Sequence, residues 1–277
     1  MPIAFSRAQI LERLRKTISD GVPIVAAESA AGLFAKCAEL GGADLIIAFA
    51  TAKSRLMGLP TGRMGDNNGL TLEMAAEILW AAKHTPVIGG VDGNDPLRMD
   101  QSRLLDEFIE AGFHAIFPFP TVAMFNDYRA LRDQVGMGFE REVQLVGLAR
   151  QRAILTMVSV YPGHPEDAAV MAEAGADIVI ANAGGTRGGL VGYDYEKTMA
   201  AAAADLEAII EAAKGANPGI ICLAHGGPFA TPKDTEYLYE HTDAVGFLGG
   251  ASIERIPVEK AVKEVVQAFK NVPVRKR

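Results

Sequence analysis

Polar residues that could take part in catalysis follow short apolar runs in several parts of the sequence. They are Glu28, Asp92, Asp95, Asn182, Arg187 and His225. Glu28 follows the apolar run at residues 22–27. An acid held against apolar walls keeps its proton more readily, as a general acid or base requires. The alternative is that Glu28 bridges backbone N–H groups of a neighbouring loop.

His225 follows the apolar run at residues 220–224. A histidine beside a bound anion could transfer a proton or polarise a carbonyl group. The alternative is a structural histidine whose ring nitrogens are satisfied by the fold. With Asp92, Glu28 and His225 form our set of candidate catalytic residues.

Asp92 lies among glycines, whose missing side chains allow a ligand or a metal ion to approach closely. Carboxylate oxygens are the ligands that Mg2+ prefers in proteins, so Asp92 is a candidate ligand for a substrate or for Mg2+. Asp95 precedes Pro96 and is interpreted as a helix cap instead. We name no other cofactor.

Two glycine pairs, Gly226-Gly227 and Gly249-Gly250, follow the last two apolar runs, and Ser252 comes shortly after the second pair. Bare backbone N–H groups next to a helix start form a cradle for phosphate or carboxylate. Asn182 and Arg187 precede these pairs in the chain, and the fork of donors on Arg187 could hold a carboxylate. The alternative for Arg187 is a solvated loop residue.

The elements that would position these residues are eight apolar runs, which alternate with helical patterns. The runs are residues 22–27, 43–49, 86–91, 115–117, 154–160, 175–181, 220–224 and 244–248. Strand and helix in alternation predict a parallel sheet with right-handed crossovers, and eight units favour closure into a (β/α)8 barrel. Residues 1–277 are therefore predicted to form one TIM-barrel domain of the α/β class.

Two additions to the barrel are expected. Ser6 and Gln9 have capping-box spacing before a short N-terminal helix. Helical patterns near residues 127–134 and 139–150 predict an extra helix between strands 4 and 5, which dimer contacts could use. The connection at residues 50–69 is long enough to be a lid or binding loop, with a solvated surface insertion as the alternative.

Composition excludes several classes of function. A formal net charge of −7 argues against a nucleic-acid partner. The sequence shows no signal peptide and no apolar run long enough to span a bilayer, so we expect a cytoplasmic protein without a membrane partner. Cys37 and Cys222 fit reduced, buried thiols better than a disulfide or a metal site.

The chain resembles the TIM-barrel family of phosphoenolpyruvate-hydrolase-like, or indole-glycerol-phosphate-synthase-like, "signal transduction" proteins. This resemblance extends to the C-terminal domain of a plant tobamovirus-resistance protein. The segments that carry it are residues 35–37, 41–46, 84–96, 119–122, 165–178, 225–228 and 249–257. The sequence departs from the family at Glu28, where a glycine-rich turn is usual, and it lacks the clustered acids that hold Mg2+ in lyases of the related superfamily.

The resemblance implies chemistry next to a 2-oxo acid or its enolate. Our first hypothesis is a lyase or hydrolase that acts on a small anionic 2-oxo acid or phosphorylated metabolite through an enolate-like intermediate. The second is a non-catalytic barrel that binds a metabolite and signals through a partner or an oligomer interface. A phosphosugar isomerase or synthase ranks last, because it would need a lysine or paired acids at strand ends. We expect a homo-oligomer.

Overall fold

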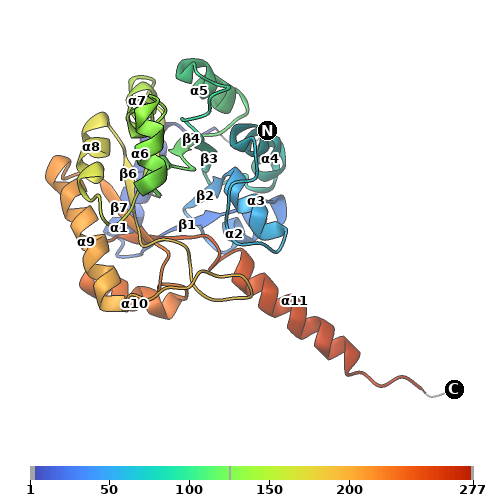
Figure 1. Cartoon of the computed structure of the whole chain (residues 1–277). Helices are drawn as coiled ribbons and strands as arrows, with labels where there is room; N and C mark the ends of the chain where they lie inside the picture. The colour runs from blue at the N-terminus through green and yellow to red at the C-terminus, as the bar shows by residue number, and fades with distance from the viewer. Residues whose placement is uncertain (1–3, 125, 276–277) are drawn as a thin grey trace.

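The computed structural model describes residues 4–124 and 126–275. Its centre is a closed barrel of parallel strands, in which each strand pairs with its neighbours in sequence and β8 pairs with β1 (Figure 1). The strands are β1 Ile24–Glu28, β2 Leu45–Ala48, β3 Val87–Val91, β4 Ala115–Pro118, β5 Leu155–Val160, β6 Ile178–Asn182, β7 Ile221–His225 and β8 Gly246–Gly249. The predicted (β/α)8 barrel of the α/β class is confirmed.

Helices surround this barrel, because each crossover between parallel strands returns the chain along the outside. Their bounds are α1 Arg7–Ser19, α2 Gly32–Leu40, α3 Lys53–Leu56, α4 Asn67–Ala81, α5 Gln101–Glu110, α6 Asn126–Gln134, α7 Phe139–Gln151, α8 Glu166–Ala174, α9 Met199–Ala216, α10 Pro232–His241 and α11 Arg255–Lys270. Helix α1 is the expected N-terminal helix, and its Ser6–Gln9 capping box is present. The expected addition between β4 and β5 is α6, which precedes α7.

The long connection after β2 is more ordered than its sequence suggests. It contains a 3-10 turn, η1 Ala50–Ala52, followed directly by α3. Helix α4 begins at Asn67, because the carboxylate of Asp66 caps it by accepting from the N–H of Gly69 at 2.9 Å. The last residues of the expected loop at 50–69 therefore belong to this helix.

Most of the apolar side chains of the strands are buried, both inside the barrel and between the strands and the helices. Burial is continuous along β2, β3, β4, β5 and β6, as expected for strands that are covered on both faces. Cys222 lies in this interior, and burial raises the pKa of its thiol to about 12. Cys37 is exposed on α2, so the expectation that it is buried was wrong.

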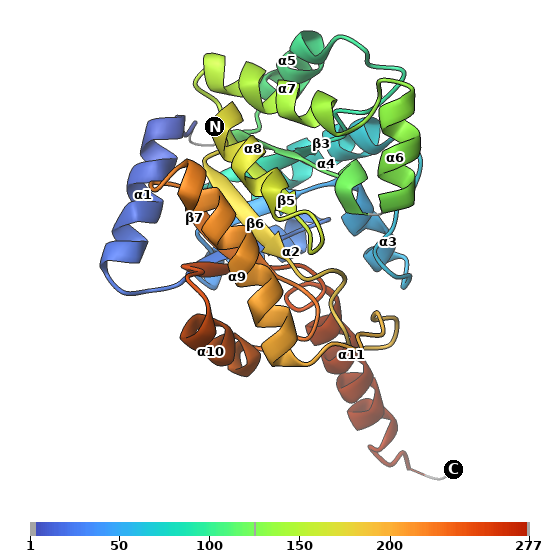
Figure 2. The ribbon, with the colours of Figure 1, turned by 60° about the vertical axis from the view of Figure 1, so that its left-hand side comes forward.

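The last helix departs from the pattern of the others. Helix α11 extends away from the barrel, and the chain ends at its far tip (Figures 1 and 2). Within the described residues, no helix is both long enough and apolar enough to cross a membrane.

Candidate active site

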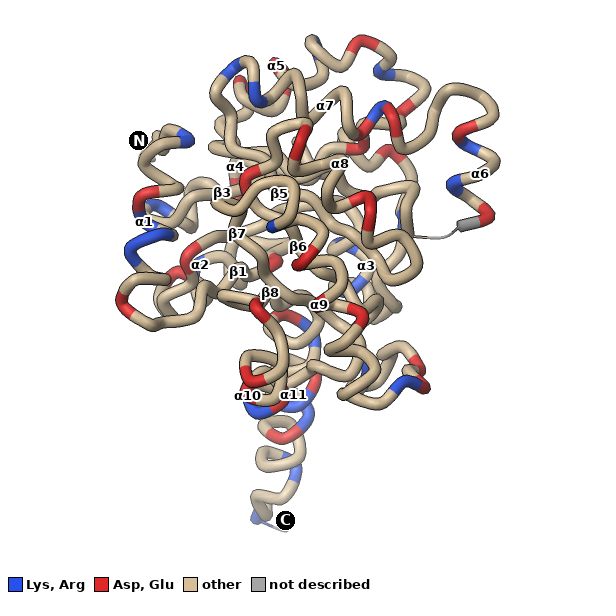
Figure 3. The backbone as a smooth tube through the Cα atoms, turned by 90° about the vertical axis from the view of Figure 1, so that its left-hand side faces the viewer, with Lys and Arg blue, Asp and Glu red and all other residues tan. Residues whose placement is uncertain are grey.

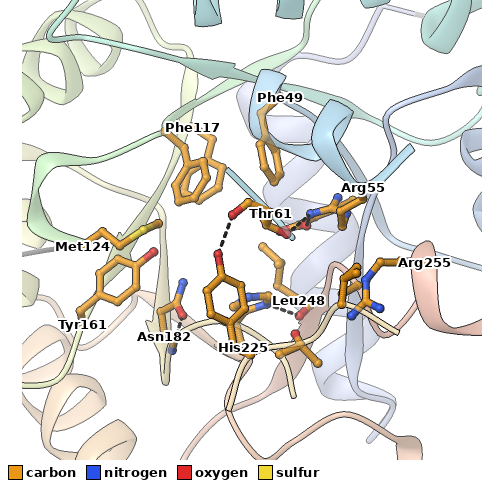
Figure 4. A pocket seen from close by; sticks show the side chains of 18 residues that line it. Phe49, Arg55, Thr61, Phe117, Met124, Tyr161, Asn182, His225, Leu248 and Arg255 are labelled. Atoms are coloured by element: carbon orange, nitrogen blue, oxygen red, sulfur yellow. Dashed lines mark hydrogen bonds and ion pairs between the residues drawn. The ribbon is translucent and has the colours of Figure 1, made fainter. Parts of the chain in front are cut away.

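A cavity of about 210 Å3 opens at the carboxyl ends of the strands (Figure 4). Loops after several different strands contribute to its wall, as is usual for barrels of this kind. The lining residues used below are Glu28, Phe49, Arg55, Thr61, Tyr161, Asn182, Tyr193, His225, Ala251 and Arg255. Glu28, Asn182 and His225, three of the residues selected from the sequence, thus share one pocket.

His225, the last residue of β7, has a fixed ring orientation. Its Nδ1 lies 2.8 Å from the carbonyl oxygen of Leu248 on β8. A carbonyl oxygen only accepts hydrogen bonds, so Nδ1 carries the proton and Nε2 is left as an acceptor in the neutral ring. The side chain lines the cavity, where this free nitrogen can exchange a proton with a ligand.

Glu28 at the end of β1 is paired with a buried arginine. Nη1 of Arg55, from α3, lies 3.0 Å from Oε2 of Glu28. On its other edge Arg55 meets Glu254: its Nε donates to Oε2 at 2.7 Å, and its Nη2 lies 2.6 Å from the same oxygen. We expected apolar walls around Glu28, but the structure places a guanidinium there. Gly250 packs against the carboxylate, and a Cβ at that position would collide with Oε2.

Burial raises the pKa of Glu254, and the positive charge of Arg55 acts against that rise. The remaining oxygen, Oε1, accepts from the N–H of Ala30 at 2.6 Å. Both neighbouring carboxylates favour the charged guanidinium and raise the pKa of Arg55 against the effect of its burial. The three side chains therefore form one buried ionic cluster in which two carboxylates share one arginine.

Two loops meet over the cavity. The hydroxyl of Tyr193, in the loop after β6, donates to the carbonyl oxygen of Thr61, in the loop after β2, at 2.6 Å (Figure 4). Arg255, at the start of α11, fixes the β6 loop from the other side, since Nη2 donates to the carbonyl oxygen of Gly188 at 2.9 Å. Nη1 of Arg255 also pairs with Glu259 at 2.5 Å. Arg255 thus forms an ion pair at the start of α11 and also lines the cavity.

Tyr161 and Asn182 supply neutral polar groups to the wall. Burial raises the pKa of Tyr161, against a hydrogen bond with Ser159, so its phenol stays protonated at neutral pH. Nδ2 of Asn182 donates to Oγ of Ser159 at 2.9 Å, and its Oδ1 accepts from the N–H of Gly184 at 2.8 Å. The contacts of Asn182 shape the β6 loop, while Tyr161 presents a hydrogen-bond donor.

Asp92, at the end of β3, is not among the residues that line this cavity. Its Oδ2 accepts from Asn67 at 2.8 Å and from Arg63 at 3.3 Å. Its Oδ1 accepts from the N–H of Asn94 at 3.1 Å. Asp92 therefore belongs to a separate, buried polar cluster beside the pocket. The expectation that Asp95 is a helix cap was wrong, because α5 begins at Gln101 and is capped by Asp100; Oδ1 of Asp95 instead accepts from the N–H of Leu97 at 2.8 Å within a turn.

The donors around Asp92 do not fit Mg2+. Both carboxylate oxygens already accept from N–H groups, which a cation would repel. In the described part of the chain, no group of three or more His, Cys, Asp or Glu residues could hold a metal ion. The geometry thus gives no support to the metal site that we considered at Asp92.

The two glycine pairs differ in how their backbone groups are hydrogen-bonded. The N–H of Gly227 already donates to the carbonyl oxygen of Gly184 at 3.1 Å, and the positive φ of Gly226 and Gly227 (77° and 57°) serves this tight turn. After β8, the carbonyl of Gly250 accepts from Ile253 and Glu254, which places the N–H groups of the intervening turn near the cavity wall at Ala251. The Oγ of Ser252 is buried and has no hydrogen-bond partner among the described residues.

Arg187 is exposed and does not line the cavity. Its backbone N–H donates to the carbonyl oxygen of Gly227 at 3.2 Å, so the residue connects the loops after β6 and β7 through its main chain. This placement matches the alternative of a solvated loop arginine. The arginines in the wall are Arg55 and Arg255 instead.

Sequence reasoning missed Arg55, Glu254, Tyr161 and Tyr193. Tyr161 carried a usable signal, because it follows β5 directly and so stands at a strand end. Arg55 lies in the segment that was expected to be a lid or binding loop, but nothing local indicates that it pairs with Glu28. Glu254 looks like an ordinary helix-start residue, and its burial is visible only in the fold.

Comparison with known proteins identifies the family. The model of the phosphoenolpyruvate hydrolase-like family matches residues 9–272. The chain belongs to this family. It is 36% identical over 275 residues to the tomato (Solanum lycopersicum) ToMV susceptible protein tm-1(GCR26), a match that covers 96% of this chain and 36% of the relative. It is 31% identical over 274 residues to the y4pA protein of Sinorhizobium fredii, over 96% of this chain and 44% of that protein. The chain thus spans less than half the length of each of these two relatives.

Solved structures share the fold of this family member. Phosphonopyruvate hydrolase in complex with oxalate and Mg++ superimposes with a TM-score of 0.61 at 19% identity, over 94% of this chain and 87% of that chain. Oxaloacetate acetylhydrolase gives 0.61 at 14% identity, over 95% and 88%. A structure of 2,3-dimethylmalate lyase gives 0.59 at 13% identity, over 100% and 90%. At these identities the likeness shows the barrel alone.

Proposed function

We propose that this chain is an enzyme that acts on a small anionic 2-oxo acid or phosphorylated metabolite by lyase or hydrolase chemistry, through an enolate-like intermediate. The observation that carries the proposal is the fixed ring of His225. Its Nδ1–H is held by the carbonyl of Leu248, which leaves Nε2 as a base in the cavity. The ligands of the solved neighbours, such as oxalate, are of the same chemical class.

Guanidinium donors in the wall are the groups that would hold an anionic substrate. Arg55 and Arg255 bring two guanidiniums to the cavity, where Arg55 also pairs with Glu28 and Glu254 and Arg255 with Glu259. A guanidinium can hold a carboxylate through two parallel hydrogen bonds. We assign the anion to the side of the cavity formed by Arg255 and Ala251, where the turn after β8 supplies backbone N–H groups; the unpaired hydroxyl of Ser252 belongs to the same turn but is not among the lining residues.

Proton transfer then falls to residues across the pocket. His225 takes a proton from the substrate next to its carbonyl group and later returns it to the product. The protonated phenol of Tyr161 donates a hydrogen bond to the enolate oxygen as negative charge develops there. Glu28 serves as the second acid or base, and its ion pair with Arg55 sets its position. Asp92 contributes indirectly by holding Arg63 and Asn67 beside the pocket.

The test is a turnover screen with a matched histidine control. Phosphonopyruvate, oxaloacetate and 2,3-dimethylmalate are supplied to wild type, His225→Gln and His241→Gln, and products are followed by nuclear magnetic resonance. His241 is exposed on α10 and far from the chemistry proposed here. We expect His225→Gln to lose roughly 10²- to 10⁴-fold in kcat and His241→Gln to match wild type. Equal rates in the two variants would overturn the assignment of His225.

The second candidate, a non-catalytic barrel that binds a metabolite and signals, is favoured by one observation. Glu28 is neutralised by Arg55, and Asp92 lies outside the cavity lining, so two of the three expected catalytic acids and bases are engaged in ion pairs. This candidate predicts that oxalate raises the melting temperature while no compound of the panel is consumed. Turnover of any panel compound that depends on His225 excludes it.

A further inference from the structure

The strands bring very little charge to the cavity. All residues of the strands are described, and Glu28 is the one Asp, Glu, Lys or Arg residue among them. Figure 3 shows that charged residues lie mostly on the helices and loops around the barrel. The charged side chains that do reach the cavity, Glu28, Arg55 and Arg255, are each in an ion pair. Charge at the cavity is therefore confined to a few paired side chains, which leaves other parts of its wall to apolar residues.

Three phenylalanines form one side of the cavity. Phe49 follows β2, Phe117 lies in β4 and Phe119 follows β4, and all three line the cavity. The rings of Phe117 and Phe119 are stacked with their centroids 4.9 Å apart, and the ring of Phe49 meets that of Phe119 edge to face, also at 4.9 Å. Met124 lines the cavity as well and packs against the same hydrophobic core. We call these four residues the apolar wall.

Strand β3 holds the apolar wall in place. Gly90 of β3 lies against Phe49 and the carbonyl oxygen of Phe119, and a Cβ at this position would collide with the Cβ of Phe49. The glycine therefore lets the segments after β2 and β4 pack closely across β3. Phe49 and Phe117 are almost completely buried, so close packing restricts the movement of their rings. The apolar wall is thus formed before any ligand binds, as is usual for small-molecule sites.

The apolar wall lies across the cavity from the groups assigned to the anion and to proton transfer. The strands follow one another in sequence order around the closed barrel, so β4 stands opposite β8. The turn after β8 carries Ala251, where we assign the anion. Figure 4 shows the rings of Phe49 and Phe117 on one side of the cavity, and His225 and Asn182 on the other. A ligand whose acid group is held at the β8 turn therefore points its other end at the apolar wall.

The cavity has more room than a very small diacid fills. A closed apolar cavity of about 150 Å3 can hold one benzene molecule. The cavity at the carboxyl ends of the strands measures about 210 Å3 and is open at its mouth. Oxalate has as many non-hydrogen atoms as benzene, so oxalate alone leaves space beside the apolar wall. Water in that space would find few hydrogen-bond partners, and an apolar group that displaces it gains affinity.

We propose that the substrate of this site is a 2-oxo acid with an aryl side chain, whose ring packs on the apolar wall while its carboxylate is held at the turn after β8. The inference rests on the proposed function, because it uses the same anion site and the same base, His225. An aryl ring can meet Phe117 and Phe119 in offset-stacked or edge-to-face contacts, which contribute affinity beyond that of burial alone. The apolar wall then selects the side chain of the substrate, and the β8 turn selects its acid group.

The first test compares two stable probes that differ by one phenyl group. Oxamate and N-phenyloxamate both carry a carboxylate next to a carbonyl group, as a 2-oxo acid does. Calorimetric titration of wild type gives the affinity for each. We expect N-phenyloxamate to bind roughly tenfold to a hundredfold more tightly, the gain from burying a side chain of the size of phenylalanine. Equal affinities, or tighter binding of oxamate, overturn the inference and leave the anion site of the proposed function intact.

Two pairs of variants locate the phenyl group. Phe117→Leu should weaken N-phenyloxamate binding by roughly threefold to tenfold, because an aromatic contact is lost, and should leave oxamate binding unchanged. Phe108→Leu is the matched control, since Phe108 is a buried residue of the same core that also stacks on another phenylalanine but does not line the cavity. Met124 is only partly buried, so Met124→Gln tests the apolar wall without a change in the buried core. It should also weaken N-phenyloxamate selectively, because the ring would desolvate the amide, whereas Met99→Gln, at an exposed position outside the cavity, should not. If both Phe117→Leu and Met124→Gln bind N-phenyloxamate as their controls do, the ring does not pack on the apolar wall and the inference is wrong.

Acetanilide separates this inference from the proposed function. It has the phenyl amide of N-phenyloxamate, but a methyl group replaces the carboxylate. We expect it to bind at least about tenfold more weakly than N-phenyloxamate, because it lacks the hydrogen bonds of a charged group at the β8 turn. If acetanilide bound as tightly as N-phenyloxamate while oxamate did not bind, the anion site would be wrong, and the proposed function would fail together with the inference. If oxamate bound and the phenyl group added nothing, only the substrate class proposed here would fail.

Discussion

Arg55 Nε donates to Glu254 Oε2 at 2.7 Å, and this pair joins the loop after β2 to the start of the last helix. Both side chains are buried, and Glu254 is fully inaccessible to solvent. The pair connects positions 199 residues apart in the chain. It therefore determines how two distant segments meet at the cavity wall.

Removing Glu254 should strongly destabilise the fold. Glu254→Ala leaves the N–H of Ala30 without its acceptor and takes one carboxylate from the buried Arg55. Breaking a buried ion pair by removing one partner costs about 3–5 kcal/mol. We expect a loss of that size in the free energy of unfolding, measured by urea denaturation monitored by circular dichroism.

An exposed ion pair supplies the comparison for that measurement. Lys16 and Asp20 pair at 2.6 Å on the surface of α1, with both side chains largely in solvent. Asp20→Ala should change the free energy of unfolding by less than about 1 kcal/mol. If Glu254→Ala were no more destabilising than Asp20→Ala, Arg55 would not depend on Glu254 for its position.

Glu142 on α7 should make stability depend on pH. Burial raises the pKa of its carboxyl to about 7, although hydrogen bonds from Thr121 and the N–H of Val122 act in the opposite direction. The folded state therefore binds this proton more tightly than the unfolded chain, whose carboxyl has a pKa near 4.5. The resulting stabilisation is complete below the unfolded pKa and is lost as pH rises through 7.

Glu142→Gln removes that titration. Between about pH 4.5 and pH 8, the free energy of unfolding of wild type should fall by about 3 kcal/mol relative to this variant. Urea denaturation of both proteins at half-unit pH intervals measures the difference. A constant difference over this range would show that the carboxyl does not change protonation there.

Ser252 tests the assignment of the anion site. Its buried Oγ has no partner among the described residues, so a bound carboxylate or phosphate would supply one. A hydrogen bond to a charged group contributes about 1.5–3 kcal/mol, so Ser252→Ala should weaken oxalate binding by roughly tenfold or more. Calorimetric titration measures the affinity. Arg187→Ala is the comparison and should bind oxalate as wild type does, because Arg187 is an exposed loop residue, whereas the hydroxyl of Ser252 is buried next to Ala251 in the cavity wall.

Asp92 should be a structural residue and not a metal ligand. Calorimetric titration with MgCl2 should show no saturable binding to wild type, because the N–H donors of Asn67, Arg63 and Asn94 occupy both oxygens. Asp92→Ala should lower the free energy of unfolding by about 1–3 kcal/mol by leaving these donors without an acceptor. Saturable Mg2+ binding that this substitution abolishes would restore the metal site.

The barrel could be predicted from sequence because its signals are local and repeated. Continuous apolar runs such as Leu45–Ala48 are typical of strands buried on both faces, and their alternation with helical patterns specifies the topology. The position of His225 at the cavity follows from the same logic, because strand ends converge at one rim. Asn182 and Glu28 were placed correctly for the same reason.

The remaining features of the site depend on contacts between distant segments. Glu28 was expected to meet apolar walls, and only the fold shows that Arg55 reaches it from another loop. Asp92 ends a strand as expected, but its bonds to Asn67 and Arg63 hold it in a separate cluster. The departure of α11 from the barrel also has no local signal, since its amphipathic pattern is the same whether or not it packs there.

The hydrogen bond from Tyr193 to Thr61 has a consequence for the speed of ligand capture. Two loops touch beside the cavity, and we expect a molecule from solvent to enter mainly while that contact is broken. Association should then be limited by how often the entrance opens, and its rate constant should fall below the range set by diffusional encounter. Tyr193→Phe, which keeps the ring but loses the hydroxyl, should admit ligands faster and release them faster as well.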